Sequence, residues 1–260
     1  MAQFTPTLPQ VVLLPGMQCT AAMFEPFAAT LKEMLPSVQV RTRAITTGSY
    51  EEAVSEALSG LRSPAVLVGH SLGGTVAMAA ARLQPRSVAG LVTICSNPRA
   101  PRPDQLDLWH PQRARATGPT RLEDEDRLVR LLVGTPEEQE GDRYTAAALL
   151  CREMIRGTAP ATLVAQLTLQ LARIDERPAL SHFAGPIMAI GANDDLLVPP
   201  SAAREIADSA RSGTATVLDA ASHMAPLMRP DLVAASVARW LSDQFAYPHA
   251  AAHLDTTNRR

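Results

Sequence analysis

One stretch of the sequence, residues 64–76 with the letters PAVLVGHSLGGTV, constrains the fold more than any other. It begins as a short apolar run and continues into an alanine-rich segment that favours a helix. Between the two parts, Gly69 and Gly73 stand two residues to either side of Ser71. A strand, a glycine-flanked turn and a helix in this order match the G-x-S-x-G elbow, whose tight turn projects a serine hydroxyl. The stretch therefore predicts that Ser71 is a nucleophile at the end of a buried strand.

The glycines of this motif suit close packing, since a Cβ at Gly69 or Gly73 would collide with the neighbouring strand or helix. The helix that follows would direct its free N–H groups and the positive end of its dipole at a group bound to Ser71. The same letters also fit a glycine-rich turn with an incidental serine. Residues elsewhere in the chain must decide between these two interpretations.

Apolar runs and helical patterns alternate along the first part of the chain. Such alternation predicts parallel strands joined by right-handed crossovers through helices. The same order resumes near residue 186 and closes with a helix. The expected strands are 10–15, 38–45, 65–68, 88–95, 186–190 and 214–218. The expected helices are 21–35, 49–61, one that starts just after Ser71 and runs up to Gln84, 202–209 and 230–246.

The alternation is interrupted between residues 97 and 183, where no convincing strand is present. Helical patterns there are clearest over 123–133, 143–156 and 160–174. We expect an all-helical insertion that forms a cap above the carboxyl ends of the strands, although a packing appendage is the alternative. The predicted organisation is an α/β core from residues 1–96 and 184–246, a cap or lid from 97–183, and a disordered tail from 247–260.

Composition narrows the class of protein. Hydrophobic residues make up 46% of the chain, charged residues 19%, and the net charge is −2, as in a globular protein without a basic surface for nucleic acid. The three cysteines lack C-x-x-C spacing, which indicates free thiols in a reducing compartment. Neither a signal peptide nor a membrane-spanning run is recognisable. We expect a cytoplasmic protein with no membrane or nucleic-acid partner, compatible with a homodimer.

A serine hydroxyl needs a base to take its proton and a third group to orient that base. Of the six histidines, His223 follows a predicted strand and should therefore lie at the same sheet edge as Ser71. His70 is adjacent to Ser71, but neighbouring side chains at a sharp turn point in different directions. Asp194 and Asp195 both follow the strand at 186–190, and either can be the orienting acid.

The chain resembles the α/β-hydrolase fold superfamily, in particular its serine esterases and lactonases with a helical cap. The likeness rests on the GHSLGG motif and on the order serine, acid, histidine. It covers residues 10–95 and 185–245 as core, with 97–183 as the variable cap. The resemblance implies a mostly parallel sheet of about six strands, because the family's N-terminal hairpin has no counterpart before residue 10.

The family's spacing bears on the choice of the acid. In such proteins a proline often opens the strand, the acid follows nine residues later, and a second proline comes four residues after that. Pro186, Asp195 and Pro199 satisfy both counts and favour Asp195. The family's glycine three residues before the acid is absent, and counting from Gly191 would select Asp194 instead.

The resemblance also implies an oxyanion hole made of two backbone N–H groups. One should belong to Leu72, directly after the nucleophile. In the family the second comes from the residue after a His-Gly pair that ends the first central strand. This chain has Pro15, Gly16 and Met17 there, so the histidine is missing, yet Met17 can still offer its backbone N–H.

The expected reaction is hydrolysis of a small-molecule carboxylic ester or lactone through an acyl-enzyme on Ser71, with His223 as base and Asp195 as acid. Acyltransferase, thioesterase, aminopeptidase and slow-turnover ligand-receptor functions share this arrangement and stay open. No cofactor or metal is expected, and GHSLGG lacks the lysine of a phosphate loop. Trp109 and Met224 are candidate walls of the substrate pocket, although both residue types are also common in cores.

Overall fold

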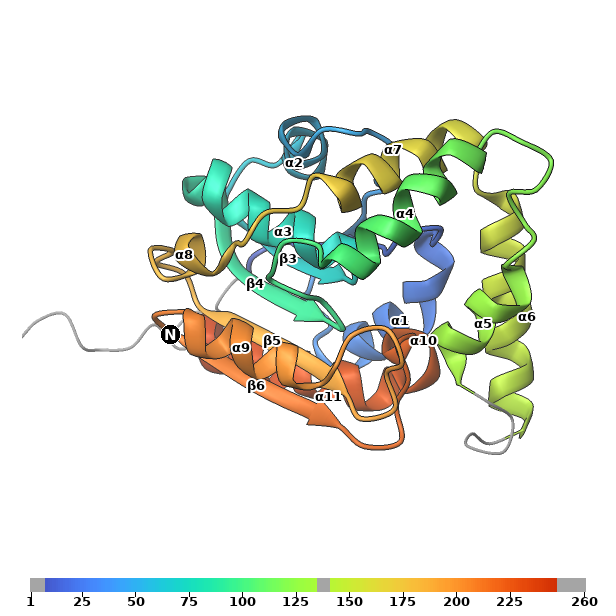
Figure 1. The fold of residues 1–260 in the computed structure, drawn as a ribbon. Helices are drawn as coiled ribbons and strands as arrows, with labels where there is room; N and C mark the ends of the chain where they lie inside the picture. Colours follow the sequence, from blue (N-terminus) through green and yellow to red (C-terminus); the bar gives the residue numbers. More distant parts are fainter. Residues whose placement is uncertain (1–7, 135–140, 247–260) are drawn as a thin grey trace, which may run out of the picture.

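A computed structural model describes residues 8–134 and 141–246; the predicted disordered tail, 247–260, lies outside these ranges. Six strands form one sheet in the order β2-β1-β3-β4-β5-β6, and every pairing is parallel. The predicted sheet of about six mostly parallel strands is confirmed (Figure 1). The strands are β1 (Val11–Leu14), β2 (Val40–Thr42), β3 (Ala65–His70), β4 (Val88–Ile94), β5 (Ile187–Ala192) and β6 (Gly213–Leu218).

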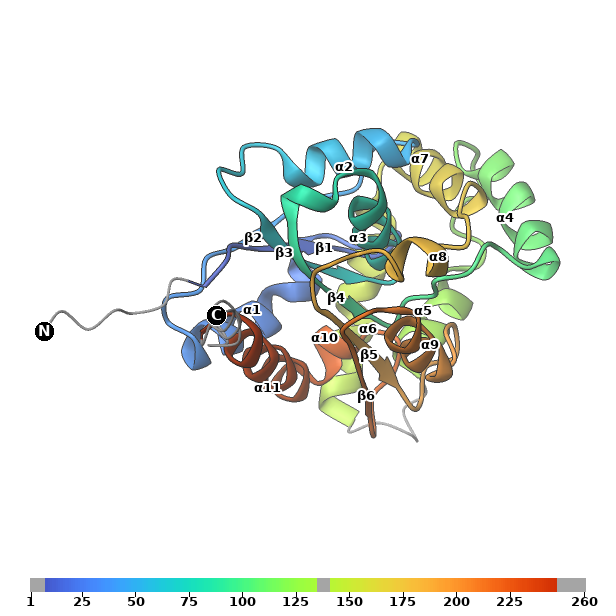
Figure 2. The same cartoon turned by 90° about the vertical axis from the view of Figure 1, so that its left-hand side faces the viewer.

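Helices cover both faces of the sheet, as its residue pattern requires. The central strands β1 and β3 are buried along their whole length and are apolar except for His70 at the end of β3, because both faces of the sheet are covered. Val11 and Leu13 point to one face, where α1 (Glu25–Met34) and α11 (Pro230–Leu241) pack. Val12 and Leu14 point to the other, which the remaining core helices cover (Figure 2). These helices are α2 (Tyr50–Leu58), α3 (Leu72–Leu83) and α9 (Ser201–Ser209).

Between β4 and β5 the described chain is helical, as predicted, and we call residues 97–183 the cap. Three of its helices match predicted ones, whereas α4 was not predicted as a separate helix because prolines at positions 103 and 111 obscure its pattern. Pro103 occupies the first helical position, where no backbone N–H is needed. The helices are α4 (Pro103–Arg115), α5 (Glu125–Val133), α6 (Gly141–Gly157), α7 (Pro160–Leu171) and α8 (Arg177–Leu180). Figure 1 shows α5 and α6 beyond the tips of the strand arrows, whereas α8 lies at the other end of the strands, beside α3 and α9.

One buried side chain of the cap holds two core loops. The Gln166 side chain on α7 accepts a hydrogen bond from the backbone N–H of Gln18 at 2.9 Å. Its amide nitrogen donates to the carbonyl of Ile45 at 3.0 Å. Gln18 follows Met17 in the loop after β1. Because both backbone groups would otherwise be buried without partners, Gln166 fixes the cap to the loop that is expected to supply an oxyanion donor.

Several predicted boundaries differ from the structure. The strand expected over 38–45 is reduced to β2, an edge strand with one neighbour. The helix expected over 21–35 begins as a 3-10 turn at Ala21–Phe24, which the Thr20 hydroxyl caps. The last helix ends its regular α turn at Leu241 and continues as a π turn over Ser242–Ala246. Across residues 8–134 and 141–246, no helix has both the length and the apolar character needed to cross a membrane.

Candidate active site

Ser71 occupies a strained turn between β3 and α3. Its backbone dihedrals, φ 50° and ψ −115°, lie outside the regions that L-residues ordinarily adopt. Two hydrogen bonds from β4 and its end hold this conformation. The Ser71 N–H donates to the carbonyl of Ile94 at 2.9 Å, and the Ser96 hydroxyl donates to the Ser71 carbonyl at 2.9 Å. The surrounding structure thus determines a serine conformation that would otherwise cost about 1–3 kcal/mol.

Backbone atoms lie so close to Gly69 and Gly73 that neither position has room for a side chain. A Cβ on Gly73 would lie 1.9 Å from the carbonyl oxygen of Leu14 at the end of β1. A Cβ on Gly69 would lie 2.3 Å from the carbonyl oxygen of Gly73. Both neighbours are backbone atoms that cannot move aside without displacing a strand or the helix. This geometry supports the elbow interpretation of the sequence over the incidental-turn one.

His223 and Asp195 meet at the same sheet edge, in the loops after β6 and β5. His223 Nδ1 lies 2.8 Å from Asp195 Oδ2, and both side chains are buried. The other carboxylate oxygen accepts the N–H groups of Leu197 at 2.8 Å and Val198 at 2.9 Å. Asp194, by contrast, is exposed, and only its backbone N–H is engaged, with the carbonyl of Ala221. The structure therefore pairs Asp195, and not Asp194, with His223.

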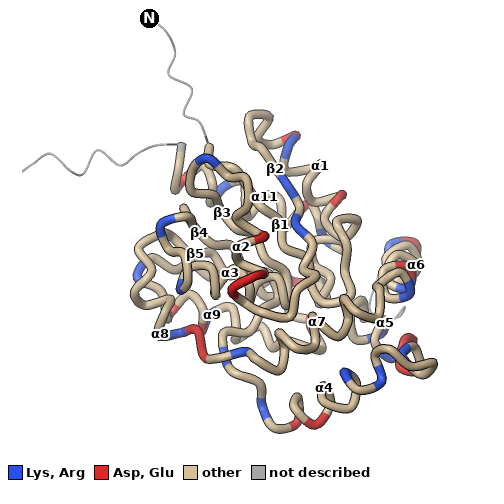
Figure 3. Tube along the Cα trace, turned by 90° about the horizontal axis from the view of Figure 1, so that it is seen from above, with Lys and Arg blue, Asp and Glu red and all other residues tan. Residues whose placement is uncertain are grey.

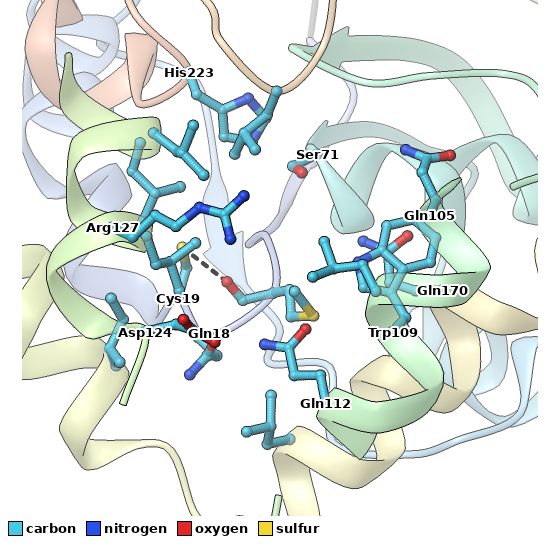
Figure 4. A pocket seen from close by; sticks show the side chains of 18 of the residues that line it. Gln18, Cys19, Ser71, Gln105, Trp109, Gln112, Asp124, Arg127, Gln170 and His223 are labelled. Carbon is cyan, nitrogen blue, oxygen red and sulfur yellow. Dashed lines mark hydrogen bonds between the residues drawn. The ribbon is translucent and has the colours of Figure 1, made fainter. Parts of the chain in front are cut away.

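The protonation of this pair follows from its surroundings. Burial raises the pKa of Asp195, but the charge and hydrogen bond of His223 and the two backbone N–H groups outweigh it. The net pKa lies below the usual value, so Asp195 is ionised at neutral pH. An ionised acceptor keeps the proton on Nδ1 of His223 and leaves its Nε2 free to accept a proton. Figure 4 shows His223 and Ser71 facing one cavity.

Cys95 is a further neighbour of this pair. Its sulfur, a carboxylate oxygen of Asp195 and a ring nitrogen of His223 lie within 4.8 Å of one another. In the part of the chain that the structure describes, this is the one cluster of three potential metal ligands. Since His223 and Asp195 are already bonded to each other, the cluster is explained without a metal. Burial, and then the Asp195 charge, raise the pKa of the Cys95 thiol well above its usual value, so it is not a nucleophile at neutral pH.

His70 supports the loop that carries His223, a role that the sequence analysis did not identify. Its Nε2 lies 2.8 Å from the backbone carbonyl of His223, and the two rings pack edge to face at 4.8 Å. Burial lowers the pKa of His70 to about 3. The ring is therefore neutral, and its Nε2–H donates to the carbonyl. Only contact between the loops could reveal this, because the sequence shows His70 merely as a neighbour of Ser71.

The buried His70 predicts a pH dependence of stability. The unfolded chain takes up a proton at this residue near pH 6.5, whereas the folded chain does so only near pH 3. Stability should therefore fall as the pH drops from 6.5 towards 3, by up to about 1.4 kcal/mol per pH unit from this group. Urea denaturation at several pH values should show a smaller slope for His70→Asn than for the wild type. The exposed His110→Asn is the matched control and should keep the wild-type slope; equal slopes for all three proteins would contradict the prediction.

The two predicted oxyanion donors lie at the turns expected for them. Leu72 is the first residue of α3, and Met17 lies in the loop after β1. Neither backbone N–H has a hydrogen-bond partner among the described residues. Next to Met17, Gln18 adopts φ 56° and is held by Gln166. Both N–H groups are thus available to a ligand, and their assignment as the oxyanion hole remains a proposal.

A cavity of about 360 Å³ separates the sheet edge from the cap. This volume falls within the roughly 300–1,000 Å³ of small-molecule sites. Ser71, His223, Met17 and Trp109 all line it, so the predicted pocket residue Trp109 is on its wall (Figure 4). Both the core and the cap supply its walls.

Met224 was expected to line this cavity, and the structure places it elsewhere. Its side chain is fully buried in the hydrophobic core, and it is not among the residues that line the cavity. Its backbone N–H donates to the carbonyl of Leu132, just before the short helix α10 (Ala225–Met228). The apolar side chains around this turn pack inward with α1 and α11. Met224 therefore joins the catalytic loop to the core and the cap.

The chain is similar to a known protein family over most of its length. A model of the alpha/beta hydrolase family matches residues 11–236. The chain belongs to this family. The match spans the core strands, the cap and the loops that carry Ser71, Asp195 and His223, so the predicted family and the predicted enzyme class, an ester-cleaving hydrolase, are both confirmed.

Two of the relatives found by sequence are named as esterases. The pimeloyl-[acyl-carrier protein] methyl ester esterase of Vibrio cholerae is 31% identical over 188 residues, which cover 69% of this chain and 71% of that protein. The enzyme of the same name from Aromatoleum aromaticum is 31% identical over 239 residues, 86% of this chain and 94% of that protein.

Solved structures share the fold at lower identity. A thermophilic esterase from Thermogutta terrifontis, solved with malate bound, superposes with a TM-score of 0.80 at 19% identity, over 93% of this chain and 92% of that one. An enol-lactonase from Burkholderia xenovorans gives a TM-score of 0.79 at 19% identity, over 90% and 92%. These similarities concern the fold alone.

Proposed function

We propose that this chain hydrolyses a carboxylic ester through an acyl-enzyme on Ser71. The observation that carries the proposal is the buried 2.8 Å bond between His223 Nδ1 and Asp195 Oδ2, at the same cavity as the strained Ser71. This arrangement gives the serine a base of fixed tautomer and orientation. It is the requirement for nucleophilic catalysis by an otherwise unreactive hydroxyl.

In the proposed reaction, the Ser71 hydroxyl attacks the ester carbonyl while Nε2 of His223 takes its proton. Asp195 stabilises the imidazolium that forms. The N–H groups of Leu72 and Met17 bind the developing oxyanion, and each such donor is typically worth about 3 kcal/mol. His223 then protonates the leaving alcohol, and the same nitrogen activates a water molecule that releases the acid and regenerates Ser71.

The substrate class is proposed from the relatives and from the cavity. The named relatives act on a methyl ester of an acyl chain, and such an ester has a small leaving group and a long acyl part. Aliphatic side chains on the cavity wall suit an acyl chain of this kind: Leu108, Leu128, Leu131 and Leu163. We therefore propose an ester of a small alcohol with an extended acyl group. A lactone, in which the ester bond closes a ring, is a second type of substrate that the triad could hydrolyse.

Burst kinetics with p-nitrophenyl esters test the proposal. We expect release of one nitrophenolate per active site, followed by a steady rate, and an acyl group on Ser71 in the intact mass spectrum. A panel that varies the acyl chain and the alcohol would then define the substrate. A burst without turnover would instead indicate a slow ligand receptor, and transfer of the acyl group to an added alcohol in preference to water would indicate an acyltransferase. If no nitrophenolate burst occurs and no acyl group is found on the protein, the proposal is refuted.

We further propose a cytoplasmic location and a small-molecule partner. The location rests on the free cysteines, Cys19, Cys95 and Cys151, which suit a reducing compartment. Cell fractionation with an antibody to the chain would test it, and recovery from an extracellular or membrane fraction would refute it.

A further inference from the structure

The walls of the active-site cavity carry more arginines than acids. Five arginines line the cavity, against three acidic residues besides the catalytic pair. The acids are all neutralised by arginines within the described chain: Asp104 by Arg102 at 2.8 Å, Asp124 by Arg115 at 3.8 Å, and Glu125 by Arg156 at 2.8 Å and Arg152 at 3.4 Å. Figure 3 shows that basic and acidic positions both occur along the cap helices α4, α5 and α6. The surplus of positive charge at the cavity therefore has no acidic counterpart there.

Arg173, two residues after α7, is one of these arginines and is half-buried. Its guanidinium lies 5.1 Å from the ring centroid of Trp109. Its terminal nitrogens donate to the side-chain oxygens of Gln170 and Gln105, both at 3.2 Å, and its Nε is buried without a partner. No carboxylate in the described residues pairs with it.

Such an environment is costly for a charge. Burial lowers the pKa of Arg173, yet an arginine stays protonated in proteins. Amide oxygens and an aromatic face stabilise the guanidinium only in part, and a desolvated cation without a counterion destabilises the fold. Three of its five N–H groups have no acceptor among the described residues. The cavity wall thus carries a guanidinium that has unsatisfied N–H groups and no carboxylate partner among the described residues.

A second cation, Arg127, lines the same cavity. Arg127 on α5 is exposed and has no hydrogen-bond or ionic partner in the described parts of the chain. Figure 4 shows its guanidinium extending from α5 into the cavity, on the side of Ser71 and His223. An exposed cation contributes little binding energy by itself but raises the local concentration of anions. Arg127 therefore adds to the positive potential that leads to the Arg173 site.

We propose that the substrate is a half-ester of a dicarboxylic acid, and that Arg173 binds its free carboxylate while Ser71 attacks the ester at the other end. This proposal rests on the proposed ester hydrolysis and names its substrate class. A carboxylate matches the planar fork of a guanidinium and accepts two parallel N–H bonds from it. Attack by the Ser71 hydroxyl releases the alcohol and leaves the acyl group on Ser71. Water then cleaves the acyl–serine bond, so one water is consumed and a dicarboxylate leaves.

A structural role is the competing account of Arg173. The residue connects α4 to the end of α7 through Gln105 and Gln170, and it could serve only to hold these helices together. Arg113 provides a matched control. It also joins α4 to α7, through a 3.4 Å bond from its guanidinium to the Thr168 hydroxyl, but it does not line the cavity. Arg113→Gln removes a helix-to-helix contact without removing a cavity charge.

The kinetic test compares the monomethyl and dimethyl esters of the same straight-chain dicarboxylic acids. The wild type should prefer the half-ester, and Arg173→Gln should lower the ratio of kcat/KM for half-ester over diester by at least about tenfold, mainly through KM. Arg173→Lys should restore part of the preference, and Arg113→Gln should keep the wild-type ratio. Equal losses on both esters, with a lowered unfolding midpoint, would show a purely structural role and overturn the proposal.

A binding test separates this proposal from the proposed reaction. In the Ser71→Ala background, calorimetry should show that the half-ester binds at least about tenfold more weakly once Arg173→Gln is added. Faster hydrolysis of diesters than of half-esters by the wild type would overturn the carboxylate site while leaving ester hydrolysis intact. No hydrolysis of either ester, with Arg173-dependent binding of the half-ester, would overturn the reaction and leave the anion site intact.

Discussion

Ser71→Ala is expected to lower kcat for p-nitrophenyl ester hydrolysis by roughly 10⁴- to 10⁶-fold, the loss seen when a serine nucleophile that acts with its base is removed. The reason is that no other hydroxyl is placed at the cavity edge in the same strained turn as Ser71. The His223–Asp195 pair, whose bond does not involve Ser71, would remain but would have no nucleophile to activate. Residual activity would come from the oxyanion donors and substrate binding alone.

The measurement combines steady-state rates with fluorophosphonate labelling and mapping of the labelled peptide. The wild type should be labelled at Ser71, and Ser71→Ala should not be labelled at all. Circular dichroism should show an intact fold, because alanine is smaller than serine and the Ser71 backbone bonds to Ile94 and Ser96 do not use the side chain. Labelling at another serine, or a loss of activity below about tenfold, would remove Ser71 from the role of nucleophile.

The core of the fold could be predicted from local pattern. The strands of parallel sheets are buried on both faces, so they stand out as apolar runs such as residues 65–68, which form the first part of β3. The helix predicted over 49–61 begins directly after Ser49, whose hydroxyl accepts the N–H of Glu52 at 3.3 Å. Chain order after successive strands brought His223 and Asp195 to the edge that carries Ser71, because the carboxyl ends of parallel strands meet there.

What could not be predicted depends on contacts between distant segments. Gln166 lies 148 residues from Gln18, and no pattern in α7 marks its buried bond to that loop. Met224 follows His223 directly, so proximity in sequence suggested the cavity, whereas the turn directs its side chain into the core. Arg173 is one arginine among many in the sequence. Only its isolation from carboxylates beside Trp109 distinguishes it, and that is a property of the folded cap.

The choice between the two neighbouring aspartates gives the second large expected effect. Asp195→Asn should lower kcat by about 10⁴-fold, as in other triads where the acid becomes an amide. An asparagine side chain can donate a hydrogen bond to Nδ1 of His223, which favours the tautomer with the proton on Nε2. That tautomer cannot accept the proton of Ser71. The N–H groups of Leu197 and Val198 would still have an amide oxygen to bond, so the loop should keep its shape.

Asp194→Asn is the matched control, since it makes the same chemical change one residue earlier. Its side chain is exposed, and its backbone N–H bond to Ala221 is unaffected by the substitution. We expect a change in kcat of less than about threefold, because an exposed carboxylate outside the pair interacts weakly with it. A larger loss in Asp194→Asn than in Asp195→Asn would mean that the acid acts from Asp194 during turnover. The geometry argues against this outcome. The carboxylate of Asp195 is buried against His223 and accepts two backbone N–H groups. The Asp194 side chain has no comparable partners among the described residues.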